Sequence, residues 1–267
     1  MRSIFAMIRA SFLTATSYRL AMVLSMAGLL VALVPVYFVS GALQQTAEES
    51  IRLEGGVLFG FLVVGMAATY LYTAAVSAPA RALSGGISSG TLEALLVTRA
   101  SLPQIVVGLV GYGILWNALR VIIVVVAAAV VGLQVTWGGV PLAVVVMALM
   151  VAGYFALGLL AASLVLVFRT PGPVVGAVLI VSALLGGVYY PTTVIPIAWL
   201  EELSAYVPVL YALRPARQLL LAGAPASEVI DDVLMLSGYA AVLLAVAMLV
   251  FARALRYARS AGTLAQY

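Results

Sequence analysis

Long runs of apolar residues are the feature of this sequence that most restricts its fold. A helix needs about 20 apolar residues to cross the hydrocarbon of a membrane. The chain is 65% hydrophobic and 8% charged, whereas a soluble domain carries about 25% charged residues. The sequence therefore predicts an all-α polytopic membrane protein with six transmembrane helices, over residues 20–39, 57–76, 105–133, 140–168, 174–188 and 233–251.

The arginines indicate which way the spans run. With the N-terminus inside, nine arginines and one acid fall in the inner segments, against three arginines and eight acids in the outer ones. Because cytoplasmic loops of membrane proteins are rich in basic residues, we expect a multi-pass plasma-membrane protein with both termini in the cytoplasm. Residues 84–103 then face the cytoplasm and residues 189–225 face outward.

Residues 1–19 are too polar to begin the first span. On a helical wheel four apolar side chains cluster beside two arginines, which predicts a helix lying in the inner membrane interface. An unstructured tail is the alternative. The chain shows no internal repeat, so we expect one membrane domain over residues 1–267. The residues on the wheel are Ile4, Phe5, Ile8 and Phe12, with Arg2 and Arg9.

Several chemistries are excluded by composition. The chain has no histidine and no cysteine, so we expect no catalytic residues and no metal site. No two acids lie inside a span, which argues against an intramembrane enzyme. There is also no P-loop motif for ATP. The net charge of +4 comes from arginines that flank the spans, and we do not expect nucleic-acid binding.

Residues 84–103, SGGISSGTLEALLVTRASLP, form the polar segment between the second and third spans. Glycines are expected to end the second span, and a short helix with an apolar stripe is expected from Thr91. Glu93 falls in the first turn of that helix, where the helix dipole stabilises an acid. Presentation of Glu93 to a cytoplasmic partner is equally compatible with the pattern. The stripe is Leu92, Leu95 and Leu96.

Residues 186–225 follow the fifth span and contain closely spaced prolines. Pro191 and Pro196 are too near each other for a straight spanning helix. The run from 195 to 207 is too short to cross the membrane and too apolar for an open loop. We therefore expect two short helices that enter the outer leaflet and return, which is tolerated where protein covers the backbone.

The segment GTLEALLVT resembles the inner-loop motif of ABC-2-type transporter permeases, in which a coupling helix docks into a separate ATPase subunit. The resemblance implies an ATPase-coupling role for this segment. The chain departs from the motif at Arg99, where a proline is usual, and Pro103 follows four residues later. The matching positions are Gly90, Thr91, Glu93, Leu95, Leu96 and Thr98.

The outer segment is similar to the re-entrant pair of the same family, which is followed by Pro-x-x-Tyr and an arginine. Pro208, Tyr211 and Arg217 fit that pattern. The resemblance implies that this segment helps to close the outer side of a translocation path. A structured outer loop without a transport role is the alternative. The implied gate residues are Tyr190, Pro191, Pro196, Pro208, Tyr211 and Arg217.

Taken over the whole chain, the resemblance implies the permease subunit of an ABC exporter. Two such chains, alike or related, would form the path, and a cytoplasmic ATPase dimer would bind ATP and Mg, so that this chain needs no cofactor of its own. The compact chain favours a hydrophobic or amphipathic small molecule or a lipid as cargo. Export of a polysaccharide or lipid-linked glycan is the main alternative. An ion-coupled secondary transporter is less supported, because no acid lies at mid-membrane.

A few polar side chains lie within the spans. Arg120 is expected to face protein or water, on the path or a subunit interface, with Asn117 one turn earlier. Alternatively, it extends toward the outer surface and pairs with Glu201 or Glu202. Two tyrosines are candidates to line the path, although aromatic residues in spans more often pack. They are Tyr70 and Tyr154.

Overall fold

The structure is a computed structural model that describes residues 19–88, 102–168 and 172–260. These ranges contain helices and turns and no β-strand. The long helices are α2 (Arg19–Ala47), α3 (Leu58–Ser88), α5 (Leu102–Val130), α6 (Val140–Phe168) and α10 (Ala226–Ser260). The short elements are η1 (Arg52–Glu54), η2 (Trp137–Gly139), α7 (Gly172–Leu185), η3 (Thr192–Val194), α8 (Ala198–Ser204), α9 (Leu210–Arg217) and η4 (Gln218–Ala222).

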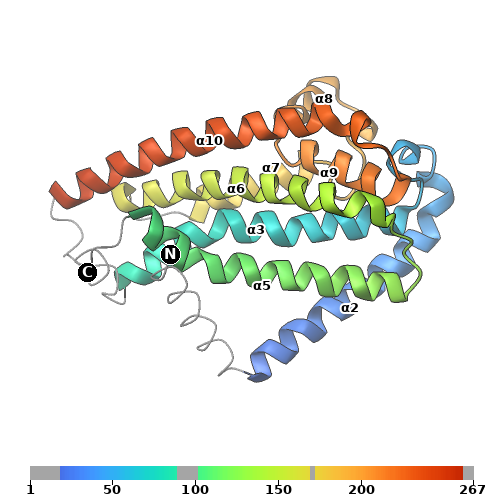
Figure 1. The fold of residues 1–267 in the computed structure, drawn as a ribbon, viewed down its shortest axis with the longest axis horizontal. Coiled ribbons are helices and arrows are strands. Elements are labelled where there is room, and N and C mark those ends of the chain that lie inside the picture. Colours follow the sequence, from blue (N-terminus) through green and yellow to red (C-terminus); the bar gives the residue numbers. More distant parts are fainter. Residues whose placement is uncertain (1–18, 89–101, 169–171, 261–267) are drawn as a thin grey trace.

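The long helices form a row in which each packs on the next. α10 lies along α6, α6 along α3, and α3 along α5, while α2 crosses obliquely against α3 and α5 (Figure 1). α3 is therefore the central helix, and 67% of its most apolar window is buried. The corresponding windows of α2 and α5 are each only 11% buried, so most of their apolar surface is open to surrounding lipid or protein.

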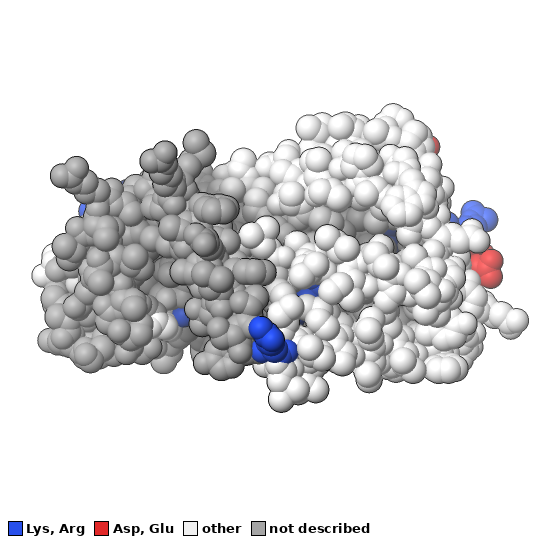
Figure 2. Space-filling model, turned by 60° about the horizontal axis from the view of Figure 1, so that its bottom comes forward, with Lys and Arg blue, Asp and Glu red and all other residues white. Residues whose placement is uncertain are grey.

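The connections gather at two ends of the row. One end holds η1, η2 and the segment from η3 to η4, which contact one another, and we call it the looped end (residues 48–57, 131–139 and 186–225). The start of α10 lies there as well (Figure 1). Every acid that the described ranges contain lies in these connections or in the first turns of α10. In the face drawn in Figure 2, red atoms are visible only toward that end, and most of the described surface is uncharged.

Five of the described helices are long and apolar enough to cross a membrane, rather than the six predicted. The exception is α7, predicted as the fifth span over residues 174–188, which has 14 residues and rises about 21 Å. Gly186 and Gly187 end it. A side chain at Gly186 would place its Cβ 2.3 Å from the Ser182 carbonyl oxygen, and Gly187 has a φ of +69° that favours glycine.

The second span is longer than predicted. The glycines at 85 and 86 were expected to end it, but α3 continues to Ser88, and α5 begins at Leu102. The first five residues of the predicted coupling segment are thus the end of a spanning helix, because glycine weakens a helix only modestly and packing can outweigh that effect. The motif residues Gly90, Thr91, Leu92, Glu93, Leu95, Leu96, Thr98 and Arg99, and the predicted interfacial helix up to Tyr18, lie outside the described residues.

α3 and α6 approach closely where α3 contains Pro79. A proline lacks the N–H that would bond to the carbonyl four residues earlier, that of Ala75. Gly158 of α6 faces this turn, and a Cβ there would lie 2.8 Å from the Ala75 oxygen and 2.6 Å from that of Val76. The missing side chain at Gly158 is therefore what allows the two helices to touch.

Replacing Gly158 by alanine is expected to force α3 and α6 apart and to destabilise the protein by about 1–3 kcal/mol, the usual range for overpacking. The measurement is the apparent melting temperature in detergent, followed by size-exclusion chromatography. Gly153→Ala on the same helix is the matched control, because its Cβ would meet nothing closer than 3.9 Å. Equal melting temperatures for the two variants would contradict this description of the α3–α6 contact.

Candidate functional site

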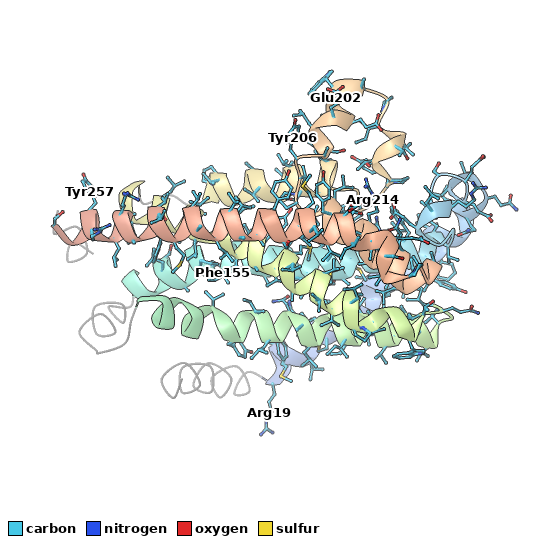
Figure 3. The ribbon with its side chains drawn as sticks, turned by 45° about the horizontal axis from the view of Figure 1, so that its top comes forward. Arg19, Phe155, Glu202, Tyr206, Arg214 and Tyr257 are labelled. Carbon is cyan, nitrogen blue, oxygen red and sulfur yellow. The ribbon has the colours of Figure 1, made fainter. Side chains whose placement is uncertain are left out.

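The segment expected to enter and leave the outer leaflet folds as two short helical pieces. α8 forms the first, and α9 continued by the π-helical turn η4 forms the second. α8 projects from the bundle with Glu202 and Tyr206 exposed (Figure 3). α9 instead packs against α3, α6 and α10 and buries most of its residues. The two pieces thus differ in role, since only the second is part of the bundle core.

Arg217 is the largest fully buried side chain among the described residues, with 2% of its surface exposed. It sits at the end of α9 and its guanidinium reaches three separate segments. Nη1 donates to Glu54 Oε2 at 3.0 Å and to the Gly187 carbonyl at 2.9 Å. Nη2 donates to the Val188 carbonyl at 3.0 Å and to the Phe61 carbonyl at 3.1 Å, while Nε lies 3.3 Å from the latter.

This site joins four parts of the chain at the looped end: η1, the first turn of α3, the turn after α7, and α9. The guanidinium carbon also lies 3.3 Å from the centroid of the Phe61 ring, a cation–π contact. Gly65 makes the approach possible, because a Cβ there would lie 2.2 Å from the Val188 oxygen. An arginine suits such a site, since its planar fork offers five donors in fixed directions.

Burial and ion pairing shift the pKa of Arg217 in opposite directions. Desolvation lowers the pKa of its guanidinium to about 10, and the nearby Glu54 carboxylate partly offsets this effect by raising it. Arg217 therefore stays charged at neutral pH. A charge taken out of water is stable only when it is paired and hydrogen-bonded, and here one carboxylate and three carbonyls meet that need.

Weaker contacts hold the rest of the looped end. Arg214 and Asp232 form a half-exposed ion pair between α9 and α10, with an N–O distance of 3.6 Å. The Tyr211 hydroxyl donates to the Ala205 carbonyl at 2.9 Å, and the Tyr190 hydroxyl donates to the Leu184 carbonyl. Each of the two predicted gate tyrosines therefore stabilises the local chain through a hydrogen bond to a carbonyl six residues earlier.

The prolines mark the boundaries of the short helices. Pro191 precedes η3, Pro196 lies exposed between η3 and α8, and Pro208 separates α8 from α9. Pro215 is buried inside α9, two residues before Arg217. Its missing N–H interrupts regular α-helical bonding just before the chain widens into the π-helical turn. Tyr211 and Arg217 thus lie on α9, Pro208 lies two residues before that helix, and Pro196 lies at the surface.

Tyr154 lies in the packed interior of this chain. It has 0% exposure, its hydroxyl donates to Ser182 Oγ at 2.6 Å, and its ring lies 5.0 Å from that of Tyr72. Tyr70 is only partly exposed, on α3. Within a single chain Tyr154 therefore has a packing contact with α7 and offers no surface to a path.

Arg120 contacts Ser25 on α2 rather than an acid at the looped end. Its Nη2 donates to Ser25 Oγ on α2, and its guanidinium lies 5.8 Å from the centroid of the Trp116 ring, one turn earlier on α5. Side chains on a helix lean toward its N-terminus, which here points away from the looped end. The predicted pairing with Glu201 or Glu202 is therefore wrong. Asn117 instead bonds to the Gly113 carbonyl of its own helix at 2.8 Å.

Several residues of these sites were missed by sequence reasoning. Glu54 was read as one of eight outer acids, and its pairing with Arg217, 163 positions away, has no local signal. Its position before Gly55 and Gly56, at the start of an apolar run, was the available clue. Gln44 was also missed. Its side chain bonds to the Gly56 carbonyl at 2.7 Å and the Leu58 N–H at 2.8 Å, which fastens α2 to the start of α3.

Removing the guanidinium as Arg217→Gln is expected to lower stability by about 3–5 kcal/mol, because a carboxylate and three carbonyls lose their buried partner. Glu54→Gln is expected to lower it by less, since its side chain is 17% exposed and the carbonyls keep their donors. Thermal unfolding in detergent measures both. Arg214→Gln is the control and should change stability by at most about 1 kcal/mol, as for other exposed pairs. Similar losses for Arg217→Gln and Arg214→Gln would contradict the central role given to Arg217.

Comparison with known protein families supports the resemblance seen in the sequence. The family described as ABC-2 type transporter matches residues 2–221, which run from before α2 to η4 and include both the GTLEALLVT segment and Arg217. None of the curated proteins matches the sequence. The family match covers well over half of the 267 residues. The chain therefore belongs to the ABC-2 type transporter family, as a membrane-embedded permease of an ABC transporter.

Proposed function

We propose that this permease exports a hydrophobic or amphipathic small molecule or a lipid, driven by separate cytoplasmic ATPase subunits. Two permease chains, identical or related, enclose the path, and two ATPase subunits bind ATP and Mg. Energy from ATP reaches the path through the segment between α3 and α5. Export of a polysaccharide or lipid-linked glycan by the same architecture is the second candidate for the cargo.

One observation carries the proposal: α3 connects the coupling motif with the buried arginine site. α3 ends at Ser88, two residues before the motif begins at Gly90, and this end of α3 lies opposite the looped end of the bundle (Figure 1). Near its first residue, Phe61 accepts hydrogen bonds from Arg217, and Gly65 touches the turn after α7. A displacement of α3 at the end next to the motif would therefore be transmitted to the residues that cover the looped end.

The outward direction is supported by the distribution of charge. Among the described residues, the acids lie at the looped end or in the first turns of α10. Arg52, Arg214 and Arg217 also lie at the looped end, whereas Arg81, Arg253 and Arg256 lie in the parts of α3 and α10 far from it. By the positive-inside rule the looped end then faces outward. α9 and η4, which fasten the looped end to α3, α6 and α10, are in this reading the outer cover of the path.

The exposed surface of the bundle supports a second permease chain. α2 and α5 bury little of their apolar surface within one chain. The chain offers large exposed side chains along both helices, and some of this area is available to a partner while the rest faces lipid. Exposed examples are Leu24, Val31 and Phe38 on α2, and Leu115, Ile122 and Val126 on α5.

Reversal of charge at Glu93 tests the coupling. Glu93→Arg is expected to leave the protein folded and inserted while reducing co-purification of the ATPase subunit by about tenfold, because complementary charges at interfaces favour the correct partner. ATP-driven transport in proteoliposomes should fall in parallel. The matched control is Glu202→Arg, a charge reversal at an exposed acid on α8, at the looped end. Unchanged ATPase binding and transport in Glu93→Arg would remove the support for coupling through this segment.

A further inference from the structure

Arg120 lies well inside a membrane-spanning helix. α5 runs from Leu102 to Val130, so Arg120 comes eighteen residues after its first residue and ten before its last. At 1.5 Å per residue this places its Cα about 15 Å from the end of α5 at the looped end and about 27 Å from the other end. A charged group at such a depth is rare in membrane proteins and usually has a specific partner.

The contacts of Arg120 leave its charge without a counter-ion in the part of the chain that the structure describes. One nitrogen donates to Ser25 Oγ and the guanidinium lies near the Trp116 ring. The Nε atom is buried and has no hydrogen-bond partner. The two ion pairs present in the described ranges belong to Arg214 and Arg217.

Within the described ranges the chain supplies no anion at that depth. Its nine acids occupy positions 48–54, 93, 201–202 and 228–232, and none falls inside α2, α3, α5, α6 or α7. The acids at the start of α10 belong to its first turns, at the looped end. An identical second copy has the same nine acids at the same places. A counter-ion for Arg120 at that depth would therefore have to come from outside the described part of this chain and of its copy.

The two helices that meet at Arg120 and Ser25 expose apolar side chains next to them in the sequence. Leu119 and Leu115 on α5 are 41% and 58% exposed, and Val23 and Leu24 on α2 are 63% and 62% exposed. In the face drawn in Figure 2, most of the described surface is uncharged. Because α2 and α5 are mostly apolar and bury little of their surface within the chain, an anion that approaches Arg120 from outside the bundle comes from the bilayer, which favours an amphiphile over a water-soluble anion.

We propose that Arg120 and Ser25 form a binding site for the anionic headgroup of an amphiphile that enters between α2 and α5. The guanidinium pairs with a phosphate or carboxylate through two parallel N–H bonds, and the Ser25 hydroxyl donates a third. Trp116 packs beside the headgroup. This site deepens the proposed function by giving the exported amphiphile a negative charge. Only its identification as cargo rests on that proposal, because binding itself needs no ATPase.

The fluorescence of Trp116 can report occupancy of the site directly. The chain has three tryptophans, and the other two, Trp137 and Trp199, are 81% and 62% exposed at the looped end. Trp137→Phe and Trp199→Phe together leave Trp116 as the single emitter. The protein is reconstituted in phosphatidylcholine vesicles that contain phosphatidic acid with brominated acyl chains, which quench a nearby indole. Brominated phosphatidylcholine in place of phosphatidic acid gives the reference.

Phosphatidic acid is expected to bind at the Trp116 site about tenfold more tightly than phosphatidylcholine, as for a charge-assisted bidentate contact. Arg120→Gln should reduce this ratio to about one. Arg120→Lys should retain part of it, and it serves if the Gln variant fails to fold. Arg214→Gln, a change of the same type at the looped end, should leave the ratio unchanged. The proposed site is contradicted if the preference for phosphatidic acid over phosphatidylcholine is near one in the starting protein, or if it is unchanged in Arg120→Gln.

Two further experiments test whether the anion is a lipid and whether it is the cargo. Soluble sn-glycerol 3-phosphate at the same headgroup concentration should not restore the fluorescence; if it does, the site is not one for an amphiphile. In the complex with the ATPase, phosphatidic acid should stimulate ATP hydrolysis in the wild type and not in Arg120→Gln. Equal stimulation overturns the cargo assignment. If no ATPase associates with the chain, the proposed permease coupling fails, yet the lipid preference of Trp116 still decides whether the site exists.

Discussion

The interaction on which the looped end depends is the burial of one arginine among backbone carbonyls. Arg217 donates to the carbonyl oxygens of Phe61, Gly187 and Val188, and so joins the start of α3 and the turn after α7 to α9. The turn after α7 leaves its carbonyls outside regular helix bonding, and in an apolar environment each needs a donor. The guanidinium supplies those donors from α9, and Glu54 balances its charge. The same side chain therefore fixes the turn, the position of α9 and the start of α3.

A second constraint is the central position of α3. It touches α6 through the missing side chain of Gly158, and the turn after α7 through that of Gly65. Both contacts bring backbone against backbone, so they leave little room for independent movement of the neighbouring helices. At these two points α3 therefore moves together with α6 and with the turn after α7.

The long helices were largely predictable from the sequence. Their length and hydropathy are enough to locate them, because packing only selects which face of each helix is buried. The bounds of α6 match the predicted span of residues 140–168. The predicted fifth span is an apolar helix in the structure, but its last three positions lie beyond α7, since only the geometry at Gly186 and Gly187 ends the helix. Prediction was wrong for the end of α3, where glycines are tolerated. Pairings such as Arg217 with Glu54, or Arg120 with Ser25, join residues 163 and 95 positions apart, and no periodicity encodes them.

The shortness of α7 has a consequence for the surrounding bilayer. A helix that rises about 21 Å covers only some two thirds of a hydrocarbon layer of about 30 Å. Because the turn that follows is buried, lipids next to α7 must either thin locally or lie against the exposed residues after that turn, such as Tyr189. Thinning carries an elastic penalty that grows with acyl-chain length. Hydrophobic mismatch is therefore expected beside α7. A change in bilayer thickness would alter the force on the turn after α7, which Arg217 holds in place.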